Sequence, residues 1–224
     1  MITHLEQELE AVKTRIFEMS DLAMEAIARS VESLKKGDVR LAERVIQGDS
    51  ELDRLEIAID EECVRVLVTK QPAAKDLRLV TAFLKINTDL ERIGDLATVV
   101  AKETIRMAGK PPVKPLVDIP RMAVLCAEMI KESFLAIAER DAARARGVIG
   151  RDREIDELNM QIYRELFSYM AENPHSISPA LSLIMASKAL ERIGDHATNI
   201  AERAIYYIEG VDVRHGAHEG SEGE

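Results

Sequence analysis

Aromatic residues are scarce in this sequence, and tryptophan is absent. Phe and Tyr together make up 4% of the chain, whereas hydrophobic residues make up 46%. Cores of Leu, Ile, Val, Ala and Met with few rings are commonest in helical bundles. A charged fraction of 31% suits long helices with a solvated outer face. The composition therefore predicts an all-α protein.

Long apolar runs and an export signal are also missing. No uncharged apolar segment approaches the roughly 18 residues that a membrane-spanning helix needs. The N-terminus has no basic region followed by an apolar run, which a secretory signal would require. These absences predict a cytoplasmic location.

The sequence also has few cysteines and no excess of positive charge. The two cysteines, Cys63 and Cys126, lie within helical apolar patterns without metal-like spacing, so we expect reduced core residues. A net charge of −10 disfavours nucleic acid and anionic membrane surfaces as partners. Metal cations and basic protein surfaces remain possible partners.

Apolar residues recur at helical spacing in six long segments, three on each side of a proline-rich stretch. Residues 109–120 contain four of the seven prolines and fall at the midpoint of the chain. We therefore expect two three-helix bundles, 1–109 and 121–210, joined by a linker at 110–120 and followed by a disordered tail at 211–224. The six expected helices cover roughly 5–36, 38–71, 79–108, 122–140, 141–170 and 178–209.

The two halves are copies of one unit. Leu-Glu-Arg-Ile-Gly-Asp occupies 90–95 and again 190–195, and only Leu96 against His196 differs between 90–98 and 190–198. Upstream, the aspartates of 49–53 match those of 152–156, so order and spacing both recur. The duplication predicts two bundles related by pseudo-symmetry.

Four pairs of carboxylates stand four residues apart on the expected helices. Each pair places two like charges on neighbouring turns, which costs about 0.2–0.5 kcal/mol unless a cation lies between them. The pairs are Asp49 with Asp53, Glu91 with Asp95, Asp152 with Asp156, and Glu191 with Asp195.

Hairpin geometry brings these pairs to the same level. The positions 53 and 91, and also 49 and 95, are centred on Pro72, where we expect the chain to turn. The pairs 156 with 191 and 152 with 195 are centred between Asn173 and Pro174. With equal rise on both arms, each hairpin presents four carboxylates within about one helical turn.

Clustered carboxylates without a matching ring of Lys or Arg indicate a hard metal cation bound through oxygen. Asn199 extends the second column by one turn and is a candidate accessory ligand, whereas the first copy has Val99 there. The alternative is four solvated acidic pairs, partly compensated by Arg92 and Arg192. Gly94 and Gly194, in mid-helix, imply a close approach by the neighbouring helix or by an ion.

Sequence signals of catalysis are weak. Di-iron bundle enzymes use Glu-x-x-His pairs, and the single example here, Glu172 to His175, contains Pro174. We find no Gly-rich phosphate loop and no nucleophile elbow. A metal-dependent helical oxidoreductase or metal store is the alternative function, and a coiled-coil scaffold is a third.

The twin Glu-Arg-Ile-Gly-Asp motifs, the upstream Asp pairs and the segment from Gln71 to Arg78 resemble the PhoU family of phosphate-signalling regulators. The resemblance covers residues 1 to about 210, although Val99 and Asn173-Pro174-His175 depart from the family pattern. It implies two three-helix bundles and assigns metal binding to the repeated acidic segments. The residues implied are Glu91, Asp95, Glu191 and Asp195, with Asp49, Asp53, Asp152 and Asp156 opposite.

The resemblance also implies a function. PhoU-like proteins are cytoplasmic, non-enzymatic negative regulators of phosphate uptake and of the phosphate-starvation regulon. They connect the ATPase subunit of the phosphate ABC transporter with the PAS domain of a sensor histidine kinase, and many form homodimers. We accordingly expect surface metal ions (Fe, Mn, Mg or Zn) and contact with the membrane only through partners.

Overall fold

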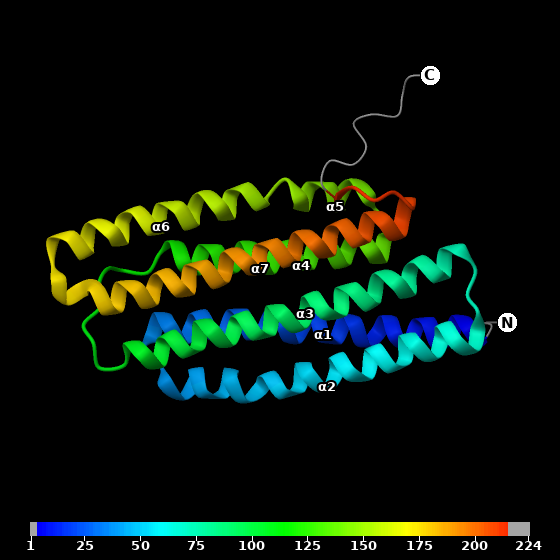
Figure 1. The fold of residues 1–224 in the computed structure, drawn as a ribbon, viewed down its shortest axis with the longest axis horizontal. Helices are drawn as coiled ribbons and strands as arrows, with labels where there is room; N and C mark the ends of the chain where they lie inside the picture. Colours follow the sequence, from blue (N-terminus) through cyan, green and yellow to red (C-terminus); the bar gives the residue numbers. More distant parts are fainter. Residues whose placement is uncertain (1–3, 215–224) are drawn as a thin grey trace, which may run out of the picture.

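The computed structural model describes residues 4–214, and within that range all regular secondary structure is helical. The prediction of an all-α fold with two three-helix bundles is confirmed (Figure 1). The helices are α1 (His4–Lys36), α2 (Val39–Lys70), α3 (Ala74–Met107), α4 (Asp118–Glu139), α5 (Ala142–Ile149), α6 (Asp152–Glu172) and α7 (Ile177–Glu209), with a 3-10 turn η1 (Pro174–Ser176).

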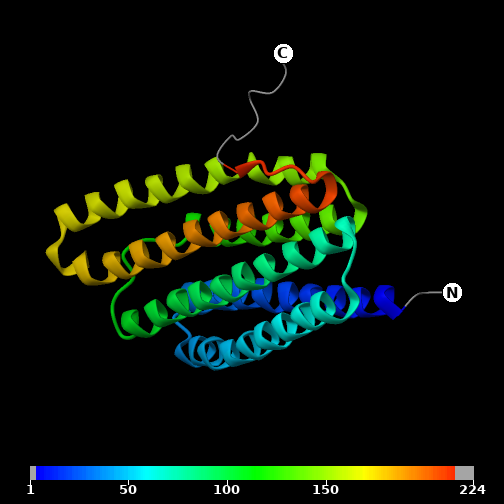
Figure 2. The ribbon, with the colours of Figure 1, turned by 45° about the vertical axis from the view of Figure 1, so that its right-hand side comes forward.

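The two bundles lie side by side along their length. The first contains α1, α2 and α3, and the second contains α4, α7 and the pair α5 and α6, as Figures 1 and 2 show. Packing of α3 on α7 forms the largest contact between helices, and α1 also packs on α4. Buried residues from both halves join in one hydrophobic core, so the two copies form a single packed body.

The helix ends follow from local sequence signals. Gly37 adopts a left-handed conformation with φ of 64°, which ends α1. Asp38 then caps α2, because its carboxylate accepts a hydrogen bond from the backbone N–H of Leu41. Asp141 caps α5 in the same way through Arg144 N–H. The α2/α3 and α6/α7 hairpins turn near Pro72 and Asn173, as the spacing predicted.

Two predicted boundaries need correction. The single helix expected over 141–170 is divided into α5 and α6 by a turn at Gly150 and Arg151. The predicted linker 110–120 is shorter in the structure because α4 begins at Asp118. The predicted disordered tail lies outside the described residues from position 215 onward.

The cysteines are the small core residues that the sequence predicted. Cys63 and Cys126 are both free and buried. Burial raises the pKa of each thiol to about 12. In residues 4–214 no helix combines the length and the apolar character needed to cross a bilayer.

Candidate metal centres

Four carboxylates of the first hairpin, Asp49 and Asp53 on α2 and Glu91 and Asp95 on α3, lie close enough to influence one another's ionisation. We call them the first quartet. Burial and the charges of Asp53 and Asp95 raise the pKa of Asp49 to about 6. The pKa of Glu91 is also raised, by burial and then by the charges of Asp95, Glu56 and Asp53, against the lowering effect of Arg92. Each shift therefore includes repulsion from the opposite helix.

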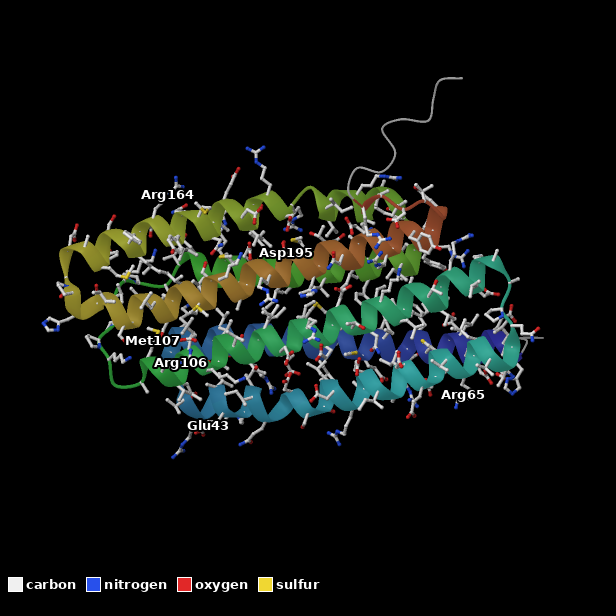
Figure 3. All side chains as sticks on the ribbon, in the orientation of Figure 1. Glu43, Arg65, Arg106, Met107, Arg164 and Asp195 are labelled. Atoms are coloured by element: carbon white, nitrogen blue, oxygen red, sulfur yellow. The ribbon has the colours of Figure 1, made fainter. Side chains whose placement is uncertain are left out.

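The second quartet, Asp152, Asp156, Glu191 and Asp195, repeats this arrangement on α6 and α7. Asp195 lies midway along α7 (Figure 3) and is exposed, as is Asp156. Desolvation and the charges of Glu191, Asp152 and Asp156 raise the pKa of this carboxyl to about 6. The pKa of Asp152 is raised by burial and by the charges of Asp156 and Glu191, and the nearby Thr198 hydroxyl partly opposes this.

The glycines of the repeated motif allow this close approach of the helices. A Cβ at Gly94 would lie 2.6 Å from Leu52 Cδ1 and 3.0 Å from Asp49 Oδ1. A Cβ at Gly194 would lie 2.8 Å from Ile155 Cδ1 and 3.6 Å from Asp152 Oδ1. Tight helix packing thus explains both glycines, and it brings the aspartate of one helix against the other.

Basic side chains next to each quartet neutralise part of its negative charge. Arg92 lies 3.3 Å from Glu91 Oε2 and 3.2 Å from Asp95 Oδ2. In the second quartet, Lys188 lies 2.6 Å from Glu191 Oε1. In the described part of the chain, no three His, Cys, Asp or Glu side chains converge closely enough to form a ready-made metal site. A cation would therefore have to turn the carboxylates away from Arg92 and Lys188.

The donor chemistry fits a hard cation. Both quartets supply carboxylate oxygens, and burial, followed by the neighbouring like charges, raises the pKa of Asp49 and Asp195 to about 6. Glu191 Oε2 is buried without a hydrogen-bond partner, which leaves a charged acceptor unsatisfied. A cation bound by oxygen ligands would satisfy this atom and remove the repulsion.

Asn199 takes part in a contact between the bundles. Its side-chain N–H donates to Asp89 Oδ1 over 3.2 Å, and His196 Nδ1 lies 2.8 Å from the same oxygen. Asp89 belongs to α3, so this polar group joins α7 to the first bundle. The sequence analysis did not identify Asp89 as a functional residue.

The corresponding positions in the other copy are all apolar. Ala189 replaces Asp89, Leu96 replaces His196 and Val99 replaces Asn199. Leu96 and Ala189 are buried in the core, and Val99 packs against it. The three contacting residues are thus polar where the matching positions of the repeat are apolar. This shared difference between the copies is a sequence signal from which the contact could have been predicted.

Replacing Asp89 with Ala should destabilise the protein by about 1–3 kcal/mol, because two partly buried donors lose their acceptor. The triple change Asp89→Ala, His196→Leu and Asn199→Val copies the apolar version and should recover most of the loss. Urea unfolding of the wild type and both variants measures the free energies of unfolding. An Asp89→Ala protein as stable as the wild type would contradict this interpretation.

Comparison with known proteins places the chain among close relatives. A PhoU domain model matches residues 16–104 and 119–204. A phosphate-specific transport system accessory protein PhoU homolog from Aquifex aeolicus is 42% identical over 209 residues, which span 93% of this chain and 95% of the relative. The homolog from Pseudomonas aeruginosa is 41% identical over 210 residues, spanning 93% of this chain and 86% of the relative.

Two solved structures share the whole architecture. The crystal structure of PhoU from Pseudomonas aeruginosa superposes with a TM-score of 0.88 at 39% identity, covering 93% of this chain and all (100%) of that one. The phosphate transport system regulatory protein PhoU from Streptococcus pneumoniae gives a TM-score of 0.87 at 25% identity, covering 94% of this chain and 99% of that one.

Proposed function

The chain belongs to the PhoU family, and from that premise we propose that it is a non-catalytic regulator of phosphate uptake. Its relatives are named accessory or regulatory proteins of the phosphate transport system. We propose that it restrains uptake and represses the phosphate-starvation regulon when phosphate is plentiful. Its place of action would be the cytoplasm, as a homodimer.

An adaptor between two partners fits the duplicated architecture. The observation that carries the proposal is that one packed body presents two matched hairpin faces, each with its own carboxylate quartet. Such a body can hold two different proteins at a fixed separation. The proposed partners are the ATPase subunit of the phosphate ABC transporter and the PAS domain of a sensor histidine kinase.

We include two surface metal centres in the proposal, with Fe, Mn, Mg or Zn as the candidate ions. The first quartet and the second quartet would supply the ligands, with Asn199 as an accessory ligand to the second. Burial and then mutual repulsion raise the pKa of Asp49 and Asp195, and a bound cation would offset the repulsion. It would thereby hold the two helices of each hairpin together.

Deletion of the gene tests the regulatory role. In phosphate-replete medium we expect constitutive expression of a phosphate-starvation reporter, because repression requires the adaptor. Restoring the gene on a plasmid should silence the reporter again. A reporter that stays silent in the deletion strain would refute the proposed function.

A further inference from the structure

The outer face of the α6/α7 hairpin exposes large apolar side chains. On α6, Met160 is 56% exposed and Phe167 is 60% exposed, and on α7 Leu181 is 50% exposed. We call this surface the α6/α7 apolar face. Its members are Met160, Tyr163, Phe167, Ile177, Leu181 and Met185, each at least 43% exposed.

These side chains form two adjacent stripes. Positions 160, 163 and 167 lie on one side of α6, and positions 177, 181 and 185 lie on one side of α7. The hydrogen bond of 2.6 Å between Ser187 and Asn159 fixes the register of the two antiparallel helices and brings the stripes to the same height. The rings of Tyr163 and Phe167 stack with centroids 6.3 Å apart.

The apolar face continues directly from the second quartet. On α6 the column runs from Asp152 through Asp156 to Met160 in steps of four residues. Beyond that face the hairpin reaches its tip, which projects past the neighbouring helices in both Figure 1 and Figure 2. The surface thus has an acidic end and an apolar, projecting end.

The first hairpin is an internal control for what folding requires. There, Asp60 stands in place of Tyr163, Thr81 in place of Leu181 and Lys85 in place of Met185. Ile57, Val64 and Leu77 are exposed on that hairpin as well, but these three polar residues interrupt them. Because both hairpins fold alike, packing does not explain the continuous apolar face on α6 and α7.

Size and charge indicate what covers this face. Six half-exposed side chains provide a few hundred Å² of apolar surface, which is less than the roughly 800 Å² per partner of a stable interface between two copies. The groove between two antiparallel helices instead suits one additional helix. A single helix from another protein is therefore the better occupant.

The surrounding charge selects a basic helix. Helix α6 carries six acidic residues and two basic ones, and the whole chain has a net charge of −10. Of the nearby cations, Lys188 is paired with Glu191, and Arg164 points away along the outer edge of α6 (Figure 3). A second copy or an anionic membrane would bring like charge to this surface.

We infer that the α6/α7 apolar face binds an amphipathic helix of a partner protein whose apolar stripe is flanked by Lys or Arg. This inference rests on the proposed function, since it assigns one of the adaptor's partners to a specific surface. The helix would lay its apolar stripe across Tyr163, Phe167 and Leu181 and direct its basic end toward the second quartet.

The test uses a labelled synthetic helical peptide of roughly 18 residues with a leucine stripe and lysines elsewhere. We expect saturable binding in fluorescence anisotropy, weakened about tenfold or more in the exposed variant Phe167→Ser/Leu181→Ser. The matched variant Val64→Ser/Leu77→Ser on the first hairpin should bind like the wild type. Circular dichroism checks that both variants remain folded.

Peptide, variant and assembly controls can overturn the inference. Equal binding of a scrambled lysine peptide, or of a peptide with Glu in place of Lys, would show that the basic amphipathic pattern is not recognised. Equal weakening in both hairpin variants would remove the assignment to α6 and α7. A dimer in sedimentation, or binding to phosphatidylserine vesicles, that is lost only in Phe167→Ser/Leu181→Ser would identify a second copy or a membrane as the occupant.

The starvation reporter separates this inference from the proposed function. We expect the Phe167→Ser/Leu181→Ser allele to derepress the reporter as the deletion does, while a Val124→Ser allele, changed at an exposed apolar residue of α4 outside both hairpins, represses normally. If the deletion derepresses but the α6/α7 variant still represses, the inference is wrong and the proposed function stands. A silent reporter in the deletion strain refutes the proposed function itself.

Discussion

Replacing Gly94 with Val should destabilise the protein by about 2–3 kcal/mol. The first side-chain carbon would lie 2.6 Å from Leu52 Cδ1 and 3.0 Å from Asp49 Oδ1. Leu52 is buried, so it has little room to move, and the two branches of valine add to the collision. Overpacking of this kind typically costs about 1–3 kcal/mol or more, which exceeds the few tenths gained by removing a helical glycine. Urea unfolding at fixed pH measures the loss.

A second glycine on the partner helix provides the matched control. Gly48 lies in α2, and a Cβ there would meet nothing within 4 Å. Gly48→Ala should therefore stabilise the protein by up to about 1 kcal/mol, because helix propensity improves without a clash. If Gly94→Val gained stability as Gly48→Ala does, close packing at the motif glycine would be refuted.

A compensating change can identify Leu52 as the side chain that collides. Leu52→Ala alone should cost about 2–5 kcal/mol because it leaves a cavity in the core. Combined with Gly94→Val, it should cost clearly less than the sum of the two single losses, because valine fills part of that cavity. Strict additivity would mean that the two positions do not share space.

The fold was predictable because the sequence contains two copies of the same helical unit. Hydrophobic spacing predicted the helices, and the matching motifs at 90–95 and 190–195 predicted the pseudo-symmetry. The division of α5 from α6 was missed because apolar spacing continues through the break: Val148 and Ile155 are both buried. A glycine at position 150 was compatible with either outcome, since Gly48 and Gly147 lie inside helices.

The site was predictable only as far as backbone spacing determines it. The spacing of residues about each hairpin turn placed four carboxylates at two levels in each hairpin. The effects of the neighbouring charges on the pKa of Asp49 and of Asp195 agree with that placement. Side-chain rotamers do not follow from spacing, so the pairing of Arg92 with both Glu91 and Asp95 could not be derived with its geometry. The contact that Asp89 makes with α7 could not be predicted, because the sequence does not show which face of α3 packs against α7.

The differences between the copies are more informative about function than their similarities. Shared positions such as Gly94 and Gly194 serve packing that both hairpins need. Where the copies diverge, packing no longer dictates the residue, as at Asp60 and Tyr163. The α6/α7 apolar face emerges from this comparison, because the first hairpin shows that the same fold forms without a continuous apolar surface.

Replacing Asp195 with Asn should have opposite effects on the metal-free and the metal-bound protein. Without metal, desolvation and then repulsion from the neighbouring carboxylates raise the pKa of Asp195 to about 6. The folded state then holds its proton more tightly than the unfolded state, so stability falls as pH rises from about 4 to about 6 and stays reduced above that. Asn removes this penalty, so metal-free Asp195→Asn should be about 1 kcal/mol more stable than the metal-free wild type at pH 7. This figure is smaller than the pKa shift alone would give, because solvent screens charges at an exposed side chain.

With a bound cation the order should reverse. A cation at a hundred times its Kd stabilises the wild type by about 2.7 kcal/mol, and Asp195→Asn removes one charged ligand, so most of that gain should be lost. Thermal unfolding of the wild type and of Asp195→Asn, each with chelator and then with Mn²⁺, measures the stability of these four states. The measurement is made at pH 5 and at pH 7. Asp21→Asn on the exposed face of α1 is the control and should not change the response to Mn²⁺. An equal Mn²⁺ shift in wild type and Asp195→Asn would remove this residue from the second metal centre, whereas a crossover would show that the repulsion within the quartet is relieved by the ion it binds.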